Sequence, residues 1–471
     1  MGREGNWAEA GENSHTSGII RSLRVATQAP QSGKPGSGRA KATTGTGRPK
    51  RRAKRSSSRF KQFLGSIGPG VITGAADDDP SGIATYSSAG ALLGTSLLWT
   101  AFITWPLMGV VQFMCARIGM VTGQGLGGVF RKKFPRWVVV AFSLALLAAN
   151  SINIGADLSG MADAGQLLSG IPSMLLVFVF GIGIAAATIA FPYQRIANIL
   201  KWLALSLFAY VIAAFVTGAS WAGVLRSTFV PSMPHGKEAW GMLVAILGTT
   251  ISPYLFYWQA AQETEEEKAR GQMSIASRRG ATGGEIVNRK LDVGLGSFFS
   301  NLVMYFIILT TALTLHRHGV THINTSKQAA EALGPIAGRF AALLFTAGVL
   351  GVGFLAIPTL SGSAAYALAE TFRWKEGLDR PLWSAPDFYA VVVISSLIGI
   401  GLNFARVSPI RALYWSAVVN GLLAPFVLVA ILIVASDRKL MCGQPSSMLS
   451  RFIVVITTLL MFGAGVGMFV F

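Results

Sequence analysis

The residues best suited to chemistry are three consecutive aspartates inside the first apolar segment. Asp77, Asp78 and Asp79 are followed by Pro80 and Gly82, with apolar, helix-forming sequence on both sides. Carboxylates are costly in a membrane-spanning segment and usually mark a function there. Proline removes a backbone donor and glycine tolerates any φ, so we expect the helix to unwind here. Unwound carbonyls and an acidic side chain facing a cavity would form a cation site. The alternative is a loop between two interfacial helices.

A second break is predicted in the sixth apolar segment, where Pro253 follows Thr249, Thr250 and Ser252. Proline kinks are common in membrane helices, and many carry no chemistry. Here, however, the first and sixth segments each begin a block of five. Paired interruptions at corresponding positions indicate an inverted-repeat transporter with its site near the middle of the membrane.

The elements that must position these residues are membrane helices. The chain has 471 residues, of which 52% are hydrophobic and 13% charged. Many apolar runs reach the roughly 20 residues that cross a bilayer, which argues against a soluble globular fold. We predict an all-α, polytopic protein with about eleven spans. They lie near residues 66–92, 95–121, 137–161, 173–191, 197–218, 240–262, 293–315, 338–366, 387–404, 411–435 and 451–470.

The charge distribution predicts the domain organisation and the orientation. Residues 1–60 are rich in Gly, Ser, Thr, Lys and Arg and are expected to form a disordered, basic tail. Residues 61–471 would form the transporter domain, with repeat one at 66–218, repeat two at 240–435 and an extra helix at 451–470. Lys and Arg concentrate in the tail and in alternate loops, including Arg278 and Arg289 between spans six and seven, which places the N-terminus in the cytoplasm.

The composition also limits partners, location and chemistry. The net charge of +19 follows membrane topology, so nucleic acid is not an expected partner. The basic run at 48–55 can contact anionic lipid, and we expect a multi-pass protein of the cell membrane. Cys115 and Cys442 cannot build a disulfide framework or a zinc site. The sequence has no nucleotide-binding loop and no His-Glu-x-x-His motif, so we expect neither an enzyme nor a cofactor.

The two breaks resemble those of the NRAMP family of divalent-metal transporters. The family's first-span motif, Asp-Pro-Gly-Asn, reads Asp79-Pro80-Ser81-Gly82 in this chain. The sixth-span motif, Ala-x-x-Met-Pro-His, reads Thr249-Thr250-Ile251-Ser252-Pro253-Tyr254. Residues 414–421 also resemble the family's tenth span. The resemblance covers roughly residues 60 to 471, and it implies a LeuT-type 5+5 inverted repeat with broken helices one and six.

The motifs also depart from the family pattern. Asp79 matches the family's metal-binding aspartate, whereas Gly82 replaces the asparagine ligand and Ser252 replaces the methionine. Tyr254 stands where the family has a histidine. The sequence therefore resembles the outlying members of the superfamily, which include magnesium transporters.

The donors left at the breaks are oxygen atoms. Oxygen ligands and water favour Mg²⁺, Ca²⁺ and Mn²⁺, whereas thioethers favour softer metals. Mg²⁺ often keeps several waters, and the smaller side chains would leave room for a hydrated ion. We therefore predict a site for Mg²⁺ or Mn²⁺ formed by Asp79, Gly82, Thr249, Ser252 and Asn420.

The predicted pathway residues are Asp77, Asp78, Asp157, Tyr254, Gln259 and Glu263. Asp157 matches an acidic residue of the family's proton route, but Gly160 replaces its glutamate partner, so we expect weak or no proton coupling. The acidic run that follows the second break is either a vestibule that concentrates cations or a solvated helix end. Gln259 and Glu263 share one helix face and are its best pathway candidates.

The function predicted from these features is divalent-cation transport by alternating access, with the broken helices moving against the remaining spans. An inside-negative potential would favour import. One alternative is a carrier of the same fold for an organic cation or an amino acid, although the first break would repel a carboxylate. A second alternative is a receptor or scaffold without flux. His316, His318 and His322 could capture metal in an outer loop, or they could be ordinary loop residues.

Overall fold

The computed structural model describes residue 74 and residues 77–192, 205–233, 235–405 and 407–470. All of them belong to the unit Arg59–Phe471. The predicted tail at 1–60 lies outside the described residues. So do the beginnings of the first and fifth predicted spans, near residues 66 and 197.

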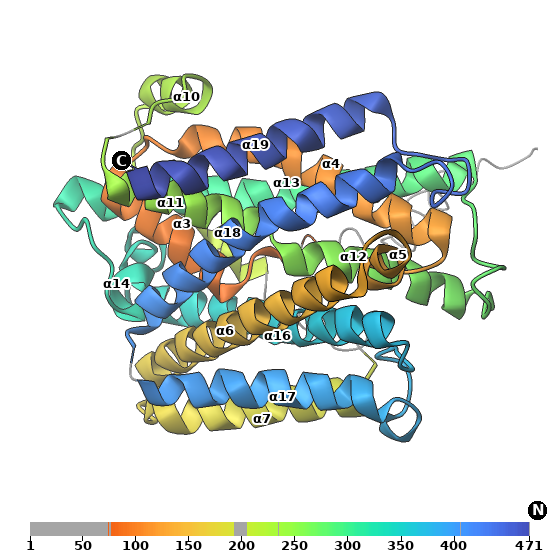
Figure 1. The fold of residues 1–471 in the computed structure, drawn as a ribbon. Helices are drawn as coiled ribbons and strands as arrows, with labels where there is room; N and C mark the ends of the chain where they lie inside the picture. Colours follow the sequence, from red (N-terminus) through yellow and green to blue (C-terminus); the bar gives the residue numbers. More distant parts are fainter. Residues whose placement is uncertain (1–73, 75–76, 193–204, 234, 406, 471) are drawn as a thin grey trace, which may run out of the picture. The chain divides into compact units, whose positions relative to one another are not determined.

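Every regular element among the described residues is helical (Figure 1). The α-helices are α3 (Pro80–Leu93), α4 (Leu98–Thr122), α5 (Leu126–Lys133), α6 (Arg136–Ser169), α7 (Ser173–Ala190), α9 (Ala209–Val216), α10 (Trp221–Phe229), α11 (Lys237–Thr250), α12 (Pro253–Ala269), α13 (Gly283–Thr314), α14 (Ser326–Glu331), α15 (Gly334–Ala337), α16 (Ala341–Phe372), α17 (Pro386–Leu402), α18 (Pro409–Ser436) and α19 (Met448–Val470). Short 3₁₀ turns lie at Leu205–Phe208, His316–His318, Gly338–Phe340, Leu382–Ser384 and Asn403–Ala405.

Nine segments of the described chain are helical, long and apolar enough to cross a membrane, with α11 and α12 forming one of them. They match nine of the predicted spans. The other two, 66–92 and 197–218, correspond to α3 and α9, whose preceding residues are not described. The all-α, polytopic prediction is therefore confirmed.

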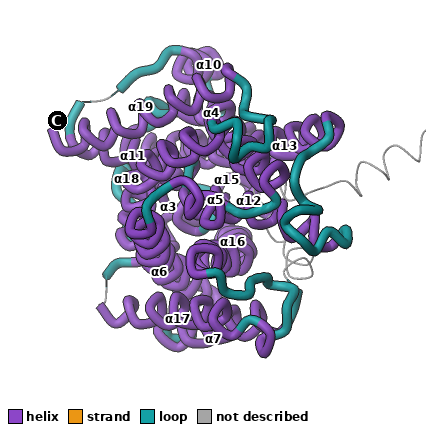
Figure 2. The backbone as a smooth tube through the Cα atoms, turned by 45° about the vertical axis from the view of Figure 1, so that its right-hand side comes forward, coloured by secondary structure: helices purple, strands orange, loops and turns teal. Residues whose placement is uncertain are grey.

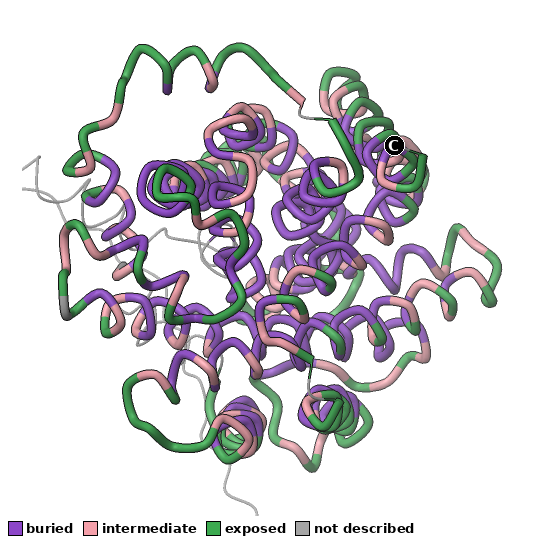
Figure 3. Tube along the Cα trace, turned by 90° about the vertical axis from the view of Figure 1, so that its left-hand side faces the viewer, coloured by how far each residue is buried: buried purple, intermediate pink, exposed green. Residues whose placement is uncertain are grey.

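The outer helices present apolar side chains outward. Val179 and Ile182 on α7 and Leu459 on α19 are each more than half exposed. Figure 3 shows exposed positions along the outer helices and buried positions toward the interior. Soluble proteins rarely expose large apolar patches, so these faces suit contact with lipid.

The two predicted broken helices pack among the other spans. Helix α3 contacts α13, α11, α18 and α6, and α12 contacts α4 and α16. Figure 2 shows α3 and α12 between α4 and α13 on one side and α6 and α16 on the other. Helices α7 and α17 pack together beyond α6, and α19 packs on α18 and α11 (Figure 1). The breaks therefore lie inside the helical unit.

One predicted boundary, the start of the seventh span, is wrong. The seventh span begins at Gly283, well before the predicted start at residue 293. Thr282 and Glu285 form a capping box that stabilises this earlier start. Arg289 and Lys290 were expected in a loop, but they belong to α13.

Candidate functional site

The first break is an extended residue ahead of a proline. Proline disfavours the α conformation in the preceding residue, and Asp79 has φ −72° and ψ 169°. Asp79 then caps α3. Its Oδ1 accepts a hydrogen bond of 2.7 Å from the Gly82 amide and another of 2.7 Å from the Ser81 hydroxyl. This cap fixes the direction of the carboxylate.

The second break repeats the same backbone arrangement. Ser252 precedes Pro253, has φ −84° and ψ 135°, and comes directly before α12. Its hydroxyl donates to the carbonyls of Gly248 at 2.6 Å and Thr249 at 2.9 Å. A hydroxyl oxygen that donates still has lone pairs, so Ser252 Oγ remains a potential ligand.

The two breaks lie side by side. A Cβ atom on Gly82 would be 3.2 Å from Thr249 Oγ1 and 3.4 Å from Asp79 Oδ1. One turn further along α3, the Tyr86 hydroxyl lies 3.2 Å from the Thr250 hydroxyl. Glycine at position 82 therefore leaves space between the carboxylate of one break and the hydroxyl of the other.

Helix α6 supplies two polar residues to the first break. The Asn153 amide donates to Asp79 Oδ2 at 2.9 Å. Asp157 is fully buried, is an electrostatic neighbour of Asp79, and has no well-formed side-chain hydrogen bond among the described residues. The sequence analysis identified Asp157 and missed Asn153. The available signal was the i, i+4 spacing of two polar residues in an apolar span.

Helix α18 reaches the second break through a contact between glycines. A Cβ on Gly248 would lie 2.1 Å from the Ala417 carbonyl oxygen and 2.6 Å from Gly421 Cα. These positions require glycine because no side chain fits between the two backbones. The close approach brings the buried residue Asn420, which precedes Gly421, to this part of the molecule.

The other two aspartates of the first break face α13. The Ser300 hydroxyl donates to Asp77 Oδ2 and, at 3.2 Å, to Asp78 Oδ1. Tyr254, at the start of α12, is fully buried and has Asp77 and Asp79 among its electrostatic neighbours. Asp79 is therefore bonded to α6, whereas Asp77 and Asp78 are bonded to α13. Nothing in the sequence distinguished Ser300 as their partner.

Several buried oxygens in this region have no hydrogen-bond partner among the described residues. They are Asp77 Oδ1, Asn153 Oδ1, Thr249 Oγ1 and Asn420 Oδ1. Buried polar atoms are normally satisfied by protein or water, so unpaired oxygens suit a hydrated cation. In the described chain no three His, Cys, Asp or Glu side chains are grouped to hold a metal.

Beyond the second break, two of the predicted pathway residues, Gln259 and Glu263, lie at a charged cluster. The Gln259 amide donates to Glu263 Oε1 at 2.7 Å, and both side chains are buried. Arg289 of α13 contacts the same Glu263 oxygen at 2.8 Å, and it also pairs with Asp292 at 2.7 Å and with Glu266. We call Arg289, Glu263, Glu266 and Asp292 the Arg289 cluster. The acidic run is therefore partly neutralised, which the sequence analysis did not predict.

The Arg289 cluster lines a cavity of about 470 Å³. Exposed residues such as Arg270 and Glu285 also line it, so the cavity reaches the surface. Gln259 is fully buried and does not line the cavity. The cavity therefore ends at the level of Glu263.

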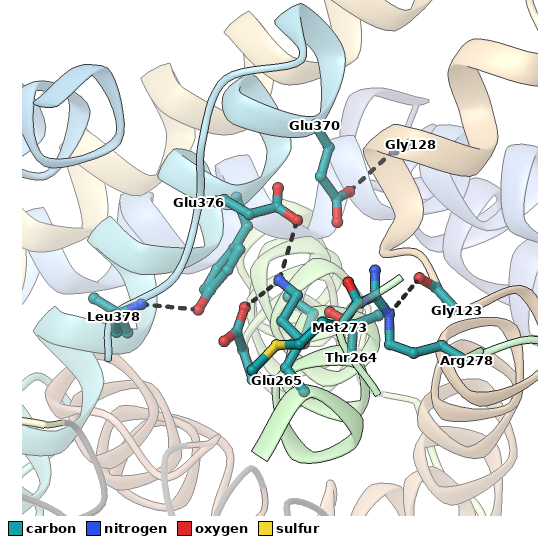
Figure 4. Close-up of polar contacts among 12 residues, drawn as sticks. Gly123, Gly128, Thr264, Glu265, Met273, Arg278, Glu370, Glu376 and Leu378 are labelled. Atoms are coloured by element: carbon teal, nitrogen blue, oxygen red, sulfur yellow. Dashed lines mark hydrogen bonds and ion pairs between the residues drawn. The ribbon is translucent and has the colours of Figure 1, made fainter. Parts of the chain in front are cut away.

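A second charged cluster holds the end of α12 to the segment that follows α16. The Lys268 amine contacts Glu265 at 2.7 Å and Glu376 at 3.5 Å. Figure 4 shows Glu265 and Glu376 converging, with Glu370 bonded to the Gly128 amide nearby. Burial raises the pKa of Glu376, and Lys268 opposes that shift. The far end of α12 is thus attached to two different parts of the chain.

The outer histidines do not form one group. His316 Nδ1 lies 2.7 Å from the Ala91 carbonyl, whereas His318 Nδ1 is bonded to the Thr314 carbonyl. His322 lines another cavity, together with Glu238 and Tyr414. His316 and His318 therefore have backbone partners.

Comparisons with known proteins place the chain in one family. The family model described as natural resistance-associated macrophage protein-like (Nramp) matches residues 70–471. A "divalent metal cation transporter MntH" of Caldanaerobacter subterraneus subsp. tengcongensis is 25% identical over 403 residues, covering 84% of this chain and 90% of the relative. The protein of the same name from Yersinia enterocolitica is 26% identical over 419 residues, covering 87% and 95%.

Solved structures show the same fold. The Eremococcus coleocola manganese transporter, in complex with an aromatic bis-isothiourea substituted compound, matches with a TM-score of 0.70 at 17% identity, covering 88% of this chain and 87% of that one. MhsT in complex with L-phenylalanine matches with a TM-score of 0.55 at 16% identity, covering 84% and 98%. At these identities the likeness concerns the fold alone.

Proposed function

The chain belongs to the Nramp family, and from this premise we propose that it transports a divalent metal cation across a membrane. Relatives named as divalent metal cation transporters support the proposal. The observation that carries it is the meeting of the two helix breaks, where Asp79 lies beside Thr249 and unpaired buried oxygens surround them. Carboxylate, amide and hydroxyl oxygens are the ligands that hard divalent cations take.

The favoured ion is Mg²⁺ or Mn²⁺. The donors at the breaks are oxygens, and glycine at position 82 keeps any side chain out of the narrow gap between Asp79 and Thr249. Ser252 provides a hydroxyl in place of a thioether, so the site gives softer metals no sulfur ligand. The proposed ligands are Asp79, Thr249, Ser252 and Asn420, with Gly82 providing the space.

The proposed mechanism is alternating access. Helices α3 and α12 begin at prolines and pack against different neighbours, so each can tilt while the scaffold helices stay in place. Proton coupling is expected to be weak because Tyr254 has no imidazole and Gly160 has no carboxylate. Gly160 instead lies against Leu413. The cell membrane is the proposed location.

Transport by purified protein in liposomes tests the proposal. We expect saturable uptake of Mn²⁺ and Mg²⁺, read by dyes inside the vesicles, and loss of both with Asp79→Ala. The matched control is Asp163→Asn, because Asp163 bonds the Ser326 amide and belongs to neither break. A pH-sensitive dye in the same vesicles should report little proton movement.

Different failures would lead to different conclusions. Cd²⁺ or Fe²⁺ uptake without Mg²⁺ or Mn²⁺ uptake would overturn the preferred ions. Strong metal-driven proton movement would overturn weak coupling. Absence of divalent-cation flux through folded protein would favour the two alternative functions. Uptake of a labelled polyamine would then distinguish an organic cation carrier from a scaffold without flux.

A further inference from the structure

The Arg289 cluster lies between the second break and the surface cavity. Glu263 is roughly 16 Å along α12 from Ser252, by the rise of an α-helix. Ser252, Gln259, Glu263 and Glu266 are spaced to form one stripe along this helix. An ion that moved from the break to the cavity along this stripe would meet Glu263 and Arg289 at the cavity's inner end.

Arg289 lies among three carboxylates, two on α12 and one on α13. Its Nε contacts Glu263 on α12, one terminal nitrogen contacts Asp292 on its own helix, and the other contacts Glu266. The side chains of Arg289 and Glu263 are 9% and 2% exposed. An arginine keeps its charge at all physiological pH values, so this cation remains among the three carboxylates.

The pair also joins broken helix α12 to α13. Glu263 is on broken helix α12, and Arg289 is on α13, which also contacts α3 and α4. Movement of α12 away from α13 would extend the cavity toward Gln259, and it would require both Glu263 and Glu266 of α12 to part from Arg289. Parting leaves Arg289 bonded to Asp292, which is on its own helix.

We propose that Arg289 is a positioning residue that closes the path between the transport site and this cavity, and that it releases Glu263 when the path opens. The proposal rests on the proposed function. The guanidinium occupies the carboxylates that a departing divalent cation would otherwise meet, so the ion exchanges with Arg289 at Glu263. The pair would thereby limit trapping of the ion in the cavity.

Accessibility of a cysteine behind the cluster tests closure without any metal. In a Cys442→Ser background, Gln259→Cys provides the reporter, and the native Cys115 stays because it is buried. Reaction with a membrane-impermeant maleimide from the cavity side should be slow. Adding Arg289→Gln should raise the rate about tenfold by shifting the population toward the open state. Arg289→Lys should give an intermediate rate.

Arg270→Gln is the matched control. Arg270 lines the same cavity and pairs with Glu266, but its side chain is 51% exposed and its recorded ion pairs do not include Glu263. It should leave the labelling rate within about twofold, since exposed ion pairs contribute little. Equal rates in the Arg289→Gln and Arg270→Gln proteins would overturn the proposal.

A second variant covers the case in which Arg289→Gln fails to fold. The double variant Glu263→Gln, Glu266→Gln removes both contacts of Arg289 with α12 and leaves Arg289 bonded to Asp292. It should also speed labelling, and an unchanged rate would overturn the proposal. In flux assays without the cysteine reporter, Arg289→Gln should lower kcat more than it changes KM for Mn²⁺, because release slows. A cluster that only supports the fold would leave that ratio unchanged.

The two proposals can fail separately. Faster labelling without metal flux in any variant would contradict the proposed function and leave the closure intact. Metal flux with unchanged labelling would contradict the closure alone.

Discussion

The two helix breaks share a backbone arrangement and differ in charge. Asp79 and Ser252 both precede a proline, both are extended, and each comes before the first residue of a half-helix. Asp79 accepts hydrogen bonds from Gly82, Ser81 and Asn153, so its direction is fixed from two helices. Among the described residues, the Ser252 hydroxyl donates only to carbonyls of its own segment. One break thus provides an oriented charge, and the other provides neutral oxygens that can rearrange.

The largest expected effect comes from removing the charge of Asp79 in the first break. Asp79→Asn keeps the size of the side chain, and we expect at least about 100-fold slower Mn²⁺ uptake because the site loses its carboxylate. Ser252→Ala should cost about tenfold or less, the scale of one hydroxyl contact. Initial uptake rates in liposomes measure both. Equal losses of uptake in the two variants would show that the two breaks do not differ in their contribution to the site.

The next effect concerns the packing of the second break. Gly248→Ala places a Cβ against the α18 backbone, and we expect about 1–3 kcal/mol lower stability from overpacking. Thermal unfolding in detergent measures the change. Gly463→Ala on α19 is the control, because its Cβ meets nothing within 4 Å and alanine favours helix. If both variants melt alike, the α11–α18 contact does not hold the break.

A smaller effect is expected from the hydrogen bond that fixes the carboxylate. Asn153→Ala removes the donor to Asp79 Oδ2, and we expect about tenfold slower Mn²⁺ uptake because a bond to a charged group is lost. Asn150→Ala is the control. Asn150 lies on the same helix and bonds the Leu360 carbonyl instead. A larger loss at Asn150 would show that α6 supports the fold here rather than Asp79.

The smallest effect is a change of preference between ions. Ser252→Met introduces a thioether at the neutral break, and we expect Cd²⁺ uptake relative to Mg²⁺ uptake to rise by about fivefold. Competition between the two ions in liposomes measures this ratio. Leu459→Met, on the outer face of α19, adds sulfur away from the break as a control. A ratio that rises equally in both proteins would contradict a ligand role for position 252.

Local sequence predicted the breaks because their causes are local. The residue before proline is restricted by sterics, so Asp79 and Ser252 could be identified without knowing any neighbour. Asn153 was detectable in principle as a polar residue in an apolar span. Ser300 and Arg289 were not, because their roles depend on where α13 lies against α3 and α12.

The misplaced start of α13 has a related cause. An apolar window cannot detect a helix whose first turns are polar, so residues 283–292 were assigned to a loop. The capping box formed by Thr282 and Glu285 was the signal available in the sequence. That polar extension carries Arg289 to Glu263.

The hydrogen bonds from the Ser252 hydroxyl to the Gly248 and Thr249 carbonyls affect how α12 can bend relative to α11. Main-chain bonding ends with Ile251 on Leu247 and resumes with Leu255 on Ser252, while Pro253 has no N–H to join the two ladders. Bending between Ile251 and Leu255 therefore changes the side-chain torsion of Ser252. The backbone hydrogen bonds of α11 and α12 stay intact. Such a pivot would let α12 tilt inside the helical unit without breaking backbone hydrogen bonds in a buried segment.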